Sequence, residues 1–157
     1  MNETVQRSRP ALPRQGRLVF GLLVFGFVAT AAYWIVWFFV DRNLLASAHT
    51  KEYFAFENAF PAADAWMALS GLAGAIALQR RKASALFWCI AAGSTSLYLA
   101  GLDILFDLEN GIYRASSGDW GAVVVELIIN ALTLFMGGYV VFWAWQRRKE
   151  LARFDGW

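Results

Sequence analysis

Hydrophobic residues are gathered into four blocks along this chain, with polar or charged segments between them. Residues 18–40, 83–102 and 127–145 contain no Asp, Glu, Lys or Arg. Each block has about 20 residues, the length that an α-helix needs to cross a hydrocarbon core of roughly 30 Å. The shorter block 65–78 reaches this length if its helix begins at Pro61, because proline is favoured in a first helical turn. The pattern therefore predicts four transmembrane helices.

The predicted fold class is all-α, a four-transmembrane-helix bundle. We expect a basic tail at 1–16, a membrane domain at 17–146 with helices at about 17–41, 61–79, 83–108 and 121–146, and a second tail at 147–157. The very short connection between the second and third helices predicts that these two are antiparallel neighbours. A soluble bundle is the alternative, but four long uncharged runs between charged loops are hard to explain in water.

Charge gives the predicted bundle an orientation. All but three of the 14 Lys and Arg residues precede the first helix, join the second to the third, or follow the fourth. The exceptions are Arg42, Lys51 and Arg114. The positive-inside rule then places both termini in the cytoplasm (N-in/C-in), with the basic ends against anionic lipid head groups. Nothing in this pattern calls for nucleic acid as a partner.

Two features of the first half allow other interpretations. Ala46-Ser47-Ala48 resembles a signal-peptide cleavage site, but the apolar run before it is longer than the usual 7–15 residues of such a signal. The segment 51–56, KEYFAF, is too apolar for a freely solvated loop. We expect it to form a short amphipathic helix at the membrane interface.

Helical spacing collects polar and small residues on one face of each helix. The sets at i, i+4, i+7 and i+11 are Thr30, Trp34, Trp37 and Asp41; Asp64, Ala68, Gly71 and Ala75; Ser96, Ala100, Asp103 and Asp107; and Glu126, Asn130, Thr133 and Gly137. Each set has a carboxylate near the outer end of its helix. Glu126 lies about 9 Å inside Trp120, and Asp103 lies one turn deeper than Asp107. A charge that faces lipid at such depth is costly, so we expect both side chains to turn inward.

These faces predict a ligand pocket in the outer half of the bundle. The candidate ligand-binding residues are Asp103, Asp107, Glu126, Asn130, Asp64, Asp41 and Trp37. Solvation at the outer helix ends is the alternative for the acids, and it suits Asp41 best. We expect Asn130 to make an interhelical hydrogen bond to Glu126 or Asp103.

Four functions fit such a pocket. The first is binding or transport of a small cationic or lipid-like molecule, with Trp34, Trp37 and Tyr98 adding cation–π contacts. The second is an accessory or assembly subunit that packs against a larger membrane complex and has no ligand of its own. The third is an intramembrane enzyme with Glu126 and Asp103 as acid and base. The fourth is a hard-metal site, because Asp, Glu and Asn oxygens suit Ca²⁺, Mg²⁺ or Mn²⁺.

Scarce residue types exclude several other functions. Cys89 is the only cysteine, which rules out a CxxC redox pair of the vitamin K epoxide reductase type. His49 is the only histidine and is expected in a loop, so neither bis-histidine haem ligation nor a serine hydrolase triad in the membrane is available. No glycine-rich phosphate loop is present. We therefore expect no cofactor, and binding is favoured over catalysis.

Two resemblances add to this interpretation. The runs FENAFPAADAW (56–66) and LDILFDLENGIY (102–113) resemble small uncharacterised bacterial four-helix membrane proteins, which implies a multi-pass protein of the bacterial inner membrane. In layout the chain is also similar to the EXPERA group of sterol isomerases and sterol-binding proteins, with Asp41, Asp103 and Glu126 echoing the acids of that group. The histidine and acid that the isomerases carry on a membrane helix are missing. The resemblance therefore implies a ligand pocket without isomerase activity.

Overall fold

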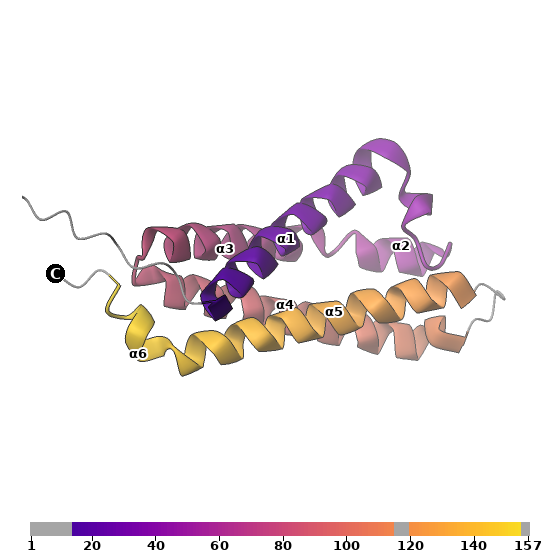
Figure 1. The fold of residues 1–157 in the computed structure, drawn as a ribbon. Coiled ribbons are helices and arrows are strands. Elements are labelled where there is room, and N and C mark those ends of the chain that lie inside the picture. Colours follow the sequence, from indigo (N-terminus) through magenta and orange to yellow (C-terminus); the bar gives the residue numbers. More distant parts are fainter. Residues whose placement is uncertain (1–13, 115–119, 155–157) are drawn as a thin grey trace, which may run out of the picture.

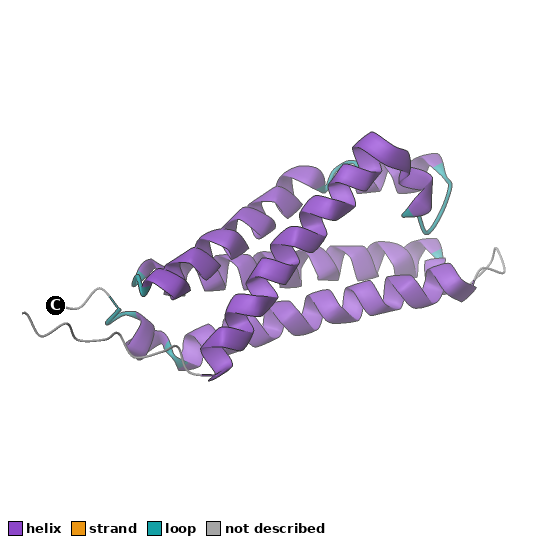
Figure 2. Ribbon diagram, turned by 45° about the horizontal axis from the view of Figure 1, so that its top comes forward, coloured by secondary structure: helices purple, strands orange, loops and turns teal. Residues whose placement is uncertain are grey.

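The computed structural model describes residues 14–114 and 120–154, and every regular element in this part of the chain is helical (Figures 1 and 2). Four of the helical stretches are long and apolar enough to cross a membrane. The predicted all-α, four-span architecture is therefore confirmed. The helices are α1 (Arg14–Val36), η1 (Trp37–Asp41), η2 (Arg42–Leu44), α2 (Lys51–Glu57), α3 (Pro61–Arg80), α4 (Ser84–Asn110), η3 (Ile112–Arg114), α5 (Trp120–Gln146) and α6 (Arg148–Leu151).

The first membrane helix changes its winding before it ends. After Val36 the chain makes a π-helical turn, η1, and the 3₁₀ turn η2 then follows. Asp41 separates the two turns, because its backbone is extended (φ −157°, ψ 111°) and its carboxylate accepts a 2.9 Å hydrogen bond from the backbone N–H of Asn43. Asp41 is therefore a capping residue.

The apolar segment after this turn folds as α2. Thr50 caps its N-terminus, with Oγ1 accepting a 3.1 Å hydrogen bond from the backbone N–H of Tyr53. The expected short helix is present, and its position at a membrane interface stays a prediction. Pro61 opens α3 at the first helical position, where its missing N–H has no intrahelical partner to lose.

Small residues bring α1, α3 and α4 into close contact. The tight connection after Arg81, which has a left-handed backbone (φ 53°), makes α3 and α4 antiparallel neighbours as expected. A Cβ added at Gly74 would lie 3.3 Å from Cδ1 of Leu23 in α1 and 3.5 Å from the backbone nitrogen of Cys89 in α4. These small side chains therefore serve packing within the chain.

Helices α4 and α5 approach even more closely. A Cβ at Gly93 would lie 2.8 Å from the backbone oxygen of Gly137, and a Cβ at Gly137 would lie 2.9 Å from the backbone oxygen of Gly93. Contacts this short leave no room for any side chain, so glycine is required on both helices. The buried core continues from here to the α6 end of the bundle, where Leu78 and Leu151 are almost fully covered.

The fourth side of the bundle, between α1 and α5, stays partly open. The two helices meet near their middles, where a Cβ on Gly26 would lie 3.6 Å from Cε of Met136. From this point they diverge toward the end where α2 lies (Figures 1 and 2). The bundle is therefore closed at the α6 end and spread at the α2 end.

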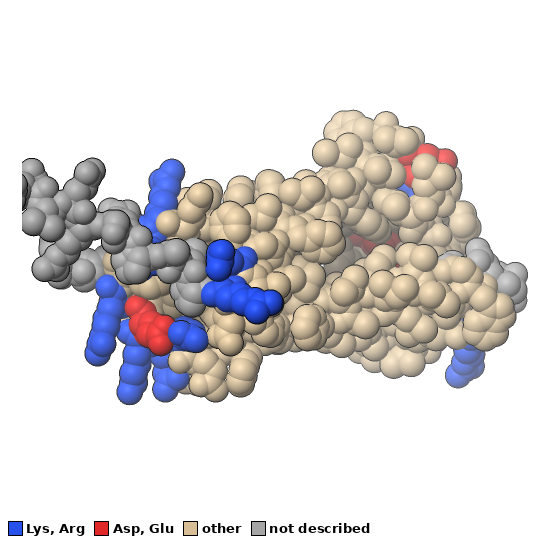
Figure 3. All heavy atoms as spheres, viewed as in Figure 1, with Lys and Arg blue, Asp and Glu red and all other residues tan. Residues whose placement is uncertain are grey.

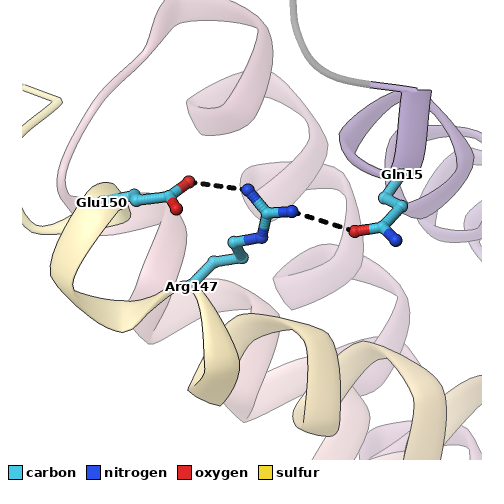
Figure 4. A network of polar contacts seen from close by, with 3 residues as sticks. All are labelled: Gln15, Arg147 and Glu150. Atoms are coloured by element: carbon cyan, nitrogen blue, oxygen red, sulfur yellow. Dashed lines mark hydrogen bonds and ion pairs between the residues drawn. The ribbon is translucent and has the colours of Figure 1, made fainter.

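The α6 end also holds most of the described basic side chains (Figure 3). There, the Arg147 guanidinium donates to Glu150 Oε2 at 2.9 Å and to Gln15 Oε1 at 3.1 Å, which ties the end of α5 to the start of α1 (Figure 4). The N-in/C-in orientation relative to a membrane stays a prediction. Residues 1–13 of the expected basic tail, residues 115–119 between the third and fourth long helices, and residues 155–157 lie outside the described part of the chain.

Candidate functional site

A cavity of about 360 Å³ lies between the four long helices. Its lining comes from α1, α3, α4 and α5, and from Leu45, Tyr53 and Glu57 in the segment that follows the first helix. The space-filling view shows a hollow between α1 and α5, with acidic atoms inside it (Figure 3). The polar faces of the helices meet at this cavity.

Four carboxylates line the end of the cavity near α2. They are Glu57, Asp64, Asp103 and Glu126, and each comes from a different helix. Among the described residues, no Lys or Arg forms an ion pair with any of them. Buried charge without a partner is costly, so protons or a bound cation must neutralise part of this set.

Neighbouring side chains fix three of these carboxylates in place. The Tyr33 hydroxyl donates to Glu57 Oε2 at 2.9 Å, and Trp34 Nε1 donates to Asp64 Oδ2, also at 2.9 Å. The hydroxyl of Ser47, in the connection before α2, donates to Glu126 Oε2. Each of these three carboxylates is therefore held by a neighbouring side chain, unlike an acid at a solvated helix end.

Asp107 lies behind the cavity in a second polar group. It is fully buried, and Asn130 Nδ2 donates to its Oδ2 at 3.1 Å and to the Tyr113 hydroxyl oxygen at 2.9 Å. Burial, together with the hydrogen bond to Asp107 and its negative charge, raises the pKa of the Tyr113 hydroxyl. Tyr113 therefore stays protonated and can donate to Asp107. The partners predicted for Asn130, Glu126 or Asp103, were wrong.

Three acids converge closely enough to hold one cation. A carboxylate oxygen from each of Asp103, Asp107 and Glu126 lies within 4.8 Å of the other two. Such an oxygen set suits a hard divalent ion, and it also suits an organic ammonium group, which needs acceptors rather than a fixed coordination geometry. These three carboxylates could therefore hold a cation of either kind.

The other end of the cavity is apolar and built from small residues. Leu22 and Leu23 contribute from α1, Gly71 from α3, and Gly93 and Gly137 from α4 and α5. No large side chain stands at Gly93 and Gly137, because the backbones of α4 and α5 are in close contact there. The cavity therefore runs from an acidic end near α2 to an apolar end in the middle of the bundle.

Of the seven residues predicted to bind a ligand, four line the cavity: Asp64, Asp103, Glu126 and Asn130. Asp103 and Glu126 turn inward, as their depth in the helices predicts. Asp107 stands just behind the lining, against Asn130. The faces predicted for α3, α4 and α5 are therefore the faces that meet.

Asp41 and Trp37 do not line the cavity. Asp41 is exposed in its capping position, while Trp37 is buried and donates from Nε1 to Asn58 Oδ1 at 3.1 Å. The π-helical turn changes the rotation per residue after Val36 and breaks the i+11 spacing to Asp41. Trp37 is the first residue of that turn, and its side chain is directed to Asn58 instead. Tyr98, expected to add a cation–π contact, is 65% exposed on the outer surface of α4.

Two residues at the acidic end were missed by sequence reasoning. Tyr33 belongs to the set Gly26, Thr30, Tyr33 and Trp37, which has the same helical spacing as the set chosen and was available in the sequence. Glu57 lies outside the predicted membrane helices, and only the path of the chain through α2 brings it to the cavity. Helical spacing could have identified Tyr33, whereas no pattern in the sequence pointed to Glu57.

Comparison with known protein families, curated proteins and solved structures finds no match to this chain. No family is therefore identified. Of what the two resemblances implied, the structure supports the four long apolar helices.

Proposed function

We propose that this protein binds or moves a small, positively charged molecule in the acidic cavity between its helices. The observation that carries the proposal is the convergence of four carboxylates on a cavity of about 360 Å³ with no described basic residue paired to them. A cation in this place would replace the missing positive partner and recover much of the cost of burying the charges. The positive-inside rule would put the acidic end on the outer side of the membrane.

The accessory role is the other candidate, and the burial of the small residues weakens it. Faces of small residues are a common surface for a partner helix in a membrane, but Gly71, Gly74 and Gly93 are buried within this bundle. The exposed side chains on α1 and α5 are instead large and apolar, as expected for contact with lipid. An accessory role would therefore need a surface other than the one that the small residues form.

Native mass spectrometry of the detergent-extracted protein tests the proposal. The wild type is compared with the Asp103→Asn/Glu126→Gln double variant and with Asp41→Asn/Glu109→Gln, which removes the same charge from two exposed positions. We expect a small-molecule or metal adduct on the wild type and the exposed control, and its loss from the cavity variant. The mass of the adduct separates a divalent ion from an organic cation.

Two outcomes would overturn the proposal. An adduct that survives in the cavity variant would place the ligand elsewhere. The absence of any adduct, with partner chains attached to all three proteins, would favour the accessory role. Circular dichroism and gel filtration of each variant guard against loss of the fold as the cause of a lost adduct.

A further inference from the structure

The cavity opens on the side between α1 and α5. Phe25 and Ala29 on α1, and Ile129 and Leu132 on α5, line the cavity and are also exposed at the surface. Phe25 is 57% exposed and Leu132 is 47% exposed. A side chain that borders a cavity and also reaches the surface marks the edge of an opening. These four residues therefore outline a gap between α1 and α5, two helices that diverge toward the α2 end (Figure 1).

This gap lies within the apolar length of both helices. α1 and α5 each belong to a stretch long and apolar enough to cross a membrane. Ile129 and Leu132 follow Val123, the first residue of the α5 stretch, by about 9 and 14 Å along the helix axis at 1.5 Å per residue. In a membrane this depth is occupied by acyl chains, so the gap faces lipid rather than water.

The end of the cavity near α2 is covered instead. Ser47 reaches Glu126 from the connection before α2, and Tyr33 holds Glu57 at the end of α2. The ring of Phe56 stacks on that of Phe106 in α4, with 3.8 Å between centroids. A molecule coming from the aqueous side would have to break these contacts, whereas the gap between α1 and α5 is already open.

The two ends of the cavity differ in polarity, and this difference describes the shape of a ligand. The carboxylates stand at one end, and the glycines Gly71, Gly93 and Gly137 with neighbouring leucines stand at the other. Glu126 and Gly137 are about 16 Å apart along α5, at 1.5 Å per residue. A narrow, elongated apolar chain with a positive charge at one end matches both features.

We propose that the cavity takes up a single-chain cationic amphiphile directly from the bilayer, through the gap between α1 and α5. The positive head group lies among Asp64, Asp103 and Glu126, and the chain runs toward Gly93 and Gly137. The inference rests on the proposed function, and it adds the class of ligand and the route by which the ligand enters.

The test uses the full chain in lipid nanodiscs and a dodecyltrimethylammonium probe with a diazirine near the end of its chain. Irradiation at increasing times after mixing gives the rate of labelling, and peptide mapping gives the position. We expect labels near Gly93 and Gly137, competition by unlabelled dodecyltrimethylammonium, and none by laurate or by tetramethylammonium at equal concentration. Laurate has the chain with the wrong charge, and tetramethylammonium has the charge without the chain.

Substitutions at the gap test the route. Ala29→Trp places a large ring at the opening, and Ala32→Trp makes the same change at an exposed position of α1 that does not line the cavity. We expect labelling of Ala29→Trp to be about tenfold slower, which corresponds to a barrier higher by about 1.4 kcal/mol, and no change for Ala32→Trp. Ile129→Trp and its control Ile128→Trp repeat the comparison on α5, should Ala29→Trp fail to fold.

The outcomes separate this inference from the proposed function. Equal labelling rates in the gap variants and their controls would overturn the lateral route and leave the cation site standing. Competition by tetramethylammonium as strong as that by the full amphiphile would overturn the role of the chain and also leave the cation site standing. Labelling unchanged by Asp103→Asn/Glu126→Gln would overturn the cationic amphiphile as the ligand of this site. The same holds if the wild type is not labelled while native mass spectrometry still finds an acid-dependent adduct. Loss of both signals would overturn the two proposals together.

Discussion

The two halves of this bundle use the same four helices in opposite ways. In the half near α6, small and apolar side chains such as Val19, Leu78 and Cys89 are almost completely buried, and the helices close around them. In the half near α2, the helices spread around a cavity lined by carboxylates. Close packing in one half holds the helices together while the other half keeps polar groups apart in a space that packing does not fill. The closely packed half therefore holds the helices in place around the cavity.

We expect the largest loss of stability from a substitution that forces α4 and α5 apart. In Gly137→Ala the new Cβ would lie 2.9 Å from the backbone oxygen of Gly93 and 3.0 Å from Cβ of Ser96, so a helix has to move. We expect a loss of about 3 kcal/mol in the free energy of unfolding, near the upper end for overpacking. Titration with sodium dodecyl sulfate in mixed micelles, followed by circular dichroism, measures it.

Gly101→Ala is the matched control for this substitution. A Cβ at Gly101 would meet nothing within 4 Å, so the same change of residue adds no contact. Its stability should equal or exceed that of the wild type, because alanine is the better helix former. Equal stability of Gly137→Ala and Gly101→Ala would contradict the close packing on which the comparison of the two halves depends.

We expect the second-largest loss of stability from the buried polar group around Asn130 in the α2 half. Asn130→Ala removes the donor to Asp107 at 3.1 Å and to Tyr113 at 2.9 Å, and it leaves Asp107 buried with fewer partners. We expect a loss of about 2 kcal/mol in the free energy of unfolding, measured as before. Tyr113→Phe should cost less because Asn130 still reaches Asp107, and a reversed order would mean that Asn130 is not the centre of this group.

The polar contact at the α6 end gives the smallest effect. Arg147 and Glu150 are 2.9 Å apart but both side chains are partly exposed, 33% and 64%. Water screens such a pair, so Glu150→Gln should lower the free energy of unfolding by at most about 0.5 kcal/mol. A loss as large as that of Asn130→Ala, in the same titration, would show that polar contacts matter as much in the closed half as in the acidic half.

Helical spacing predicted correctly which residues of α5 share one face. Glu126, Asn130, Thr133 and Gly137 were expected on one face of their helix, and all four line the cavity. The prediction worked because α5 is one continuous helix, in which spacing alone decides which side chains share a face. Beyond the change of winding at η1, the same rule placed Asp41 on the cavity face, which it does not line.

The remaining errors concern relations between segments. Spacing gave Asn130 a face but no means of choosing between Asp103, Glu126 and Asp107, because that choice depends on how far one helix slides along another. Glu57 was overlooked because α2 lies over the cavity only through the path of its flanking connections. A periodic pattern describes one helix at a time, and these contacts join two.

Composition and periodicity by themselves determined that this chain has four helices long and apolar enough to cross a membrane, and which faces of three of them are polar. Hydropathy and helical period are local properties, so the sequence expresses them directly. Only the tertiary structure decided that α1 leaves α5 beyond Gly26 and Met136, that a cavity opens there, and that Glu57 and Tyr33 complete its acidic end. These features depend on how closely particular side chains let two helices approach, and that distance is set by both partners at once.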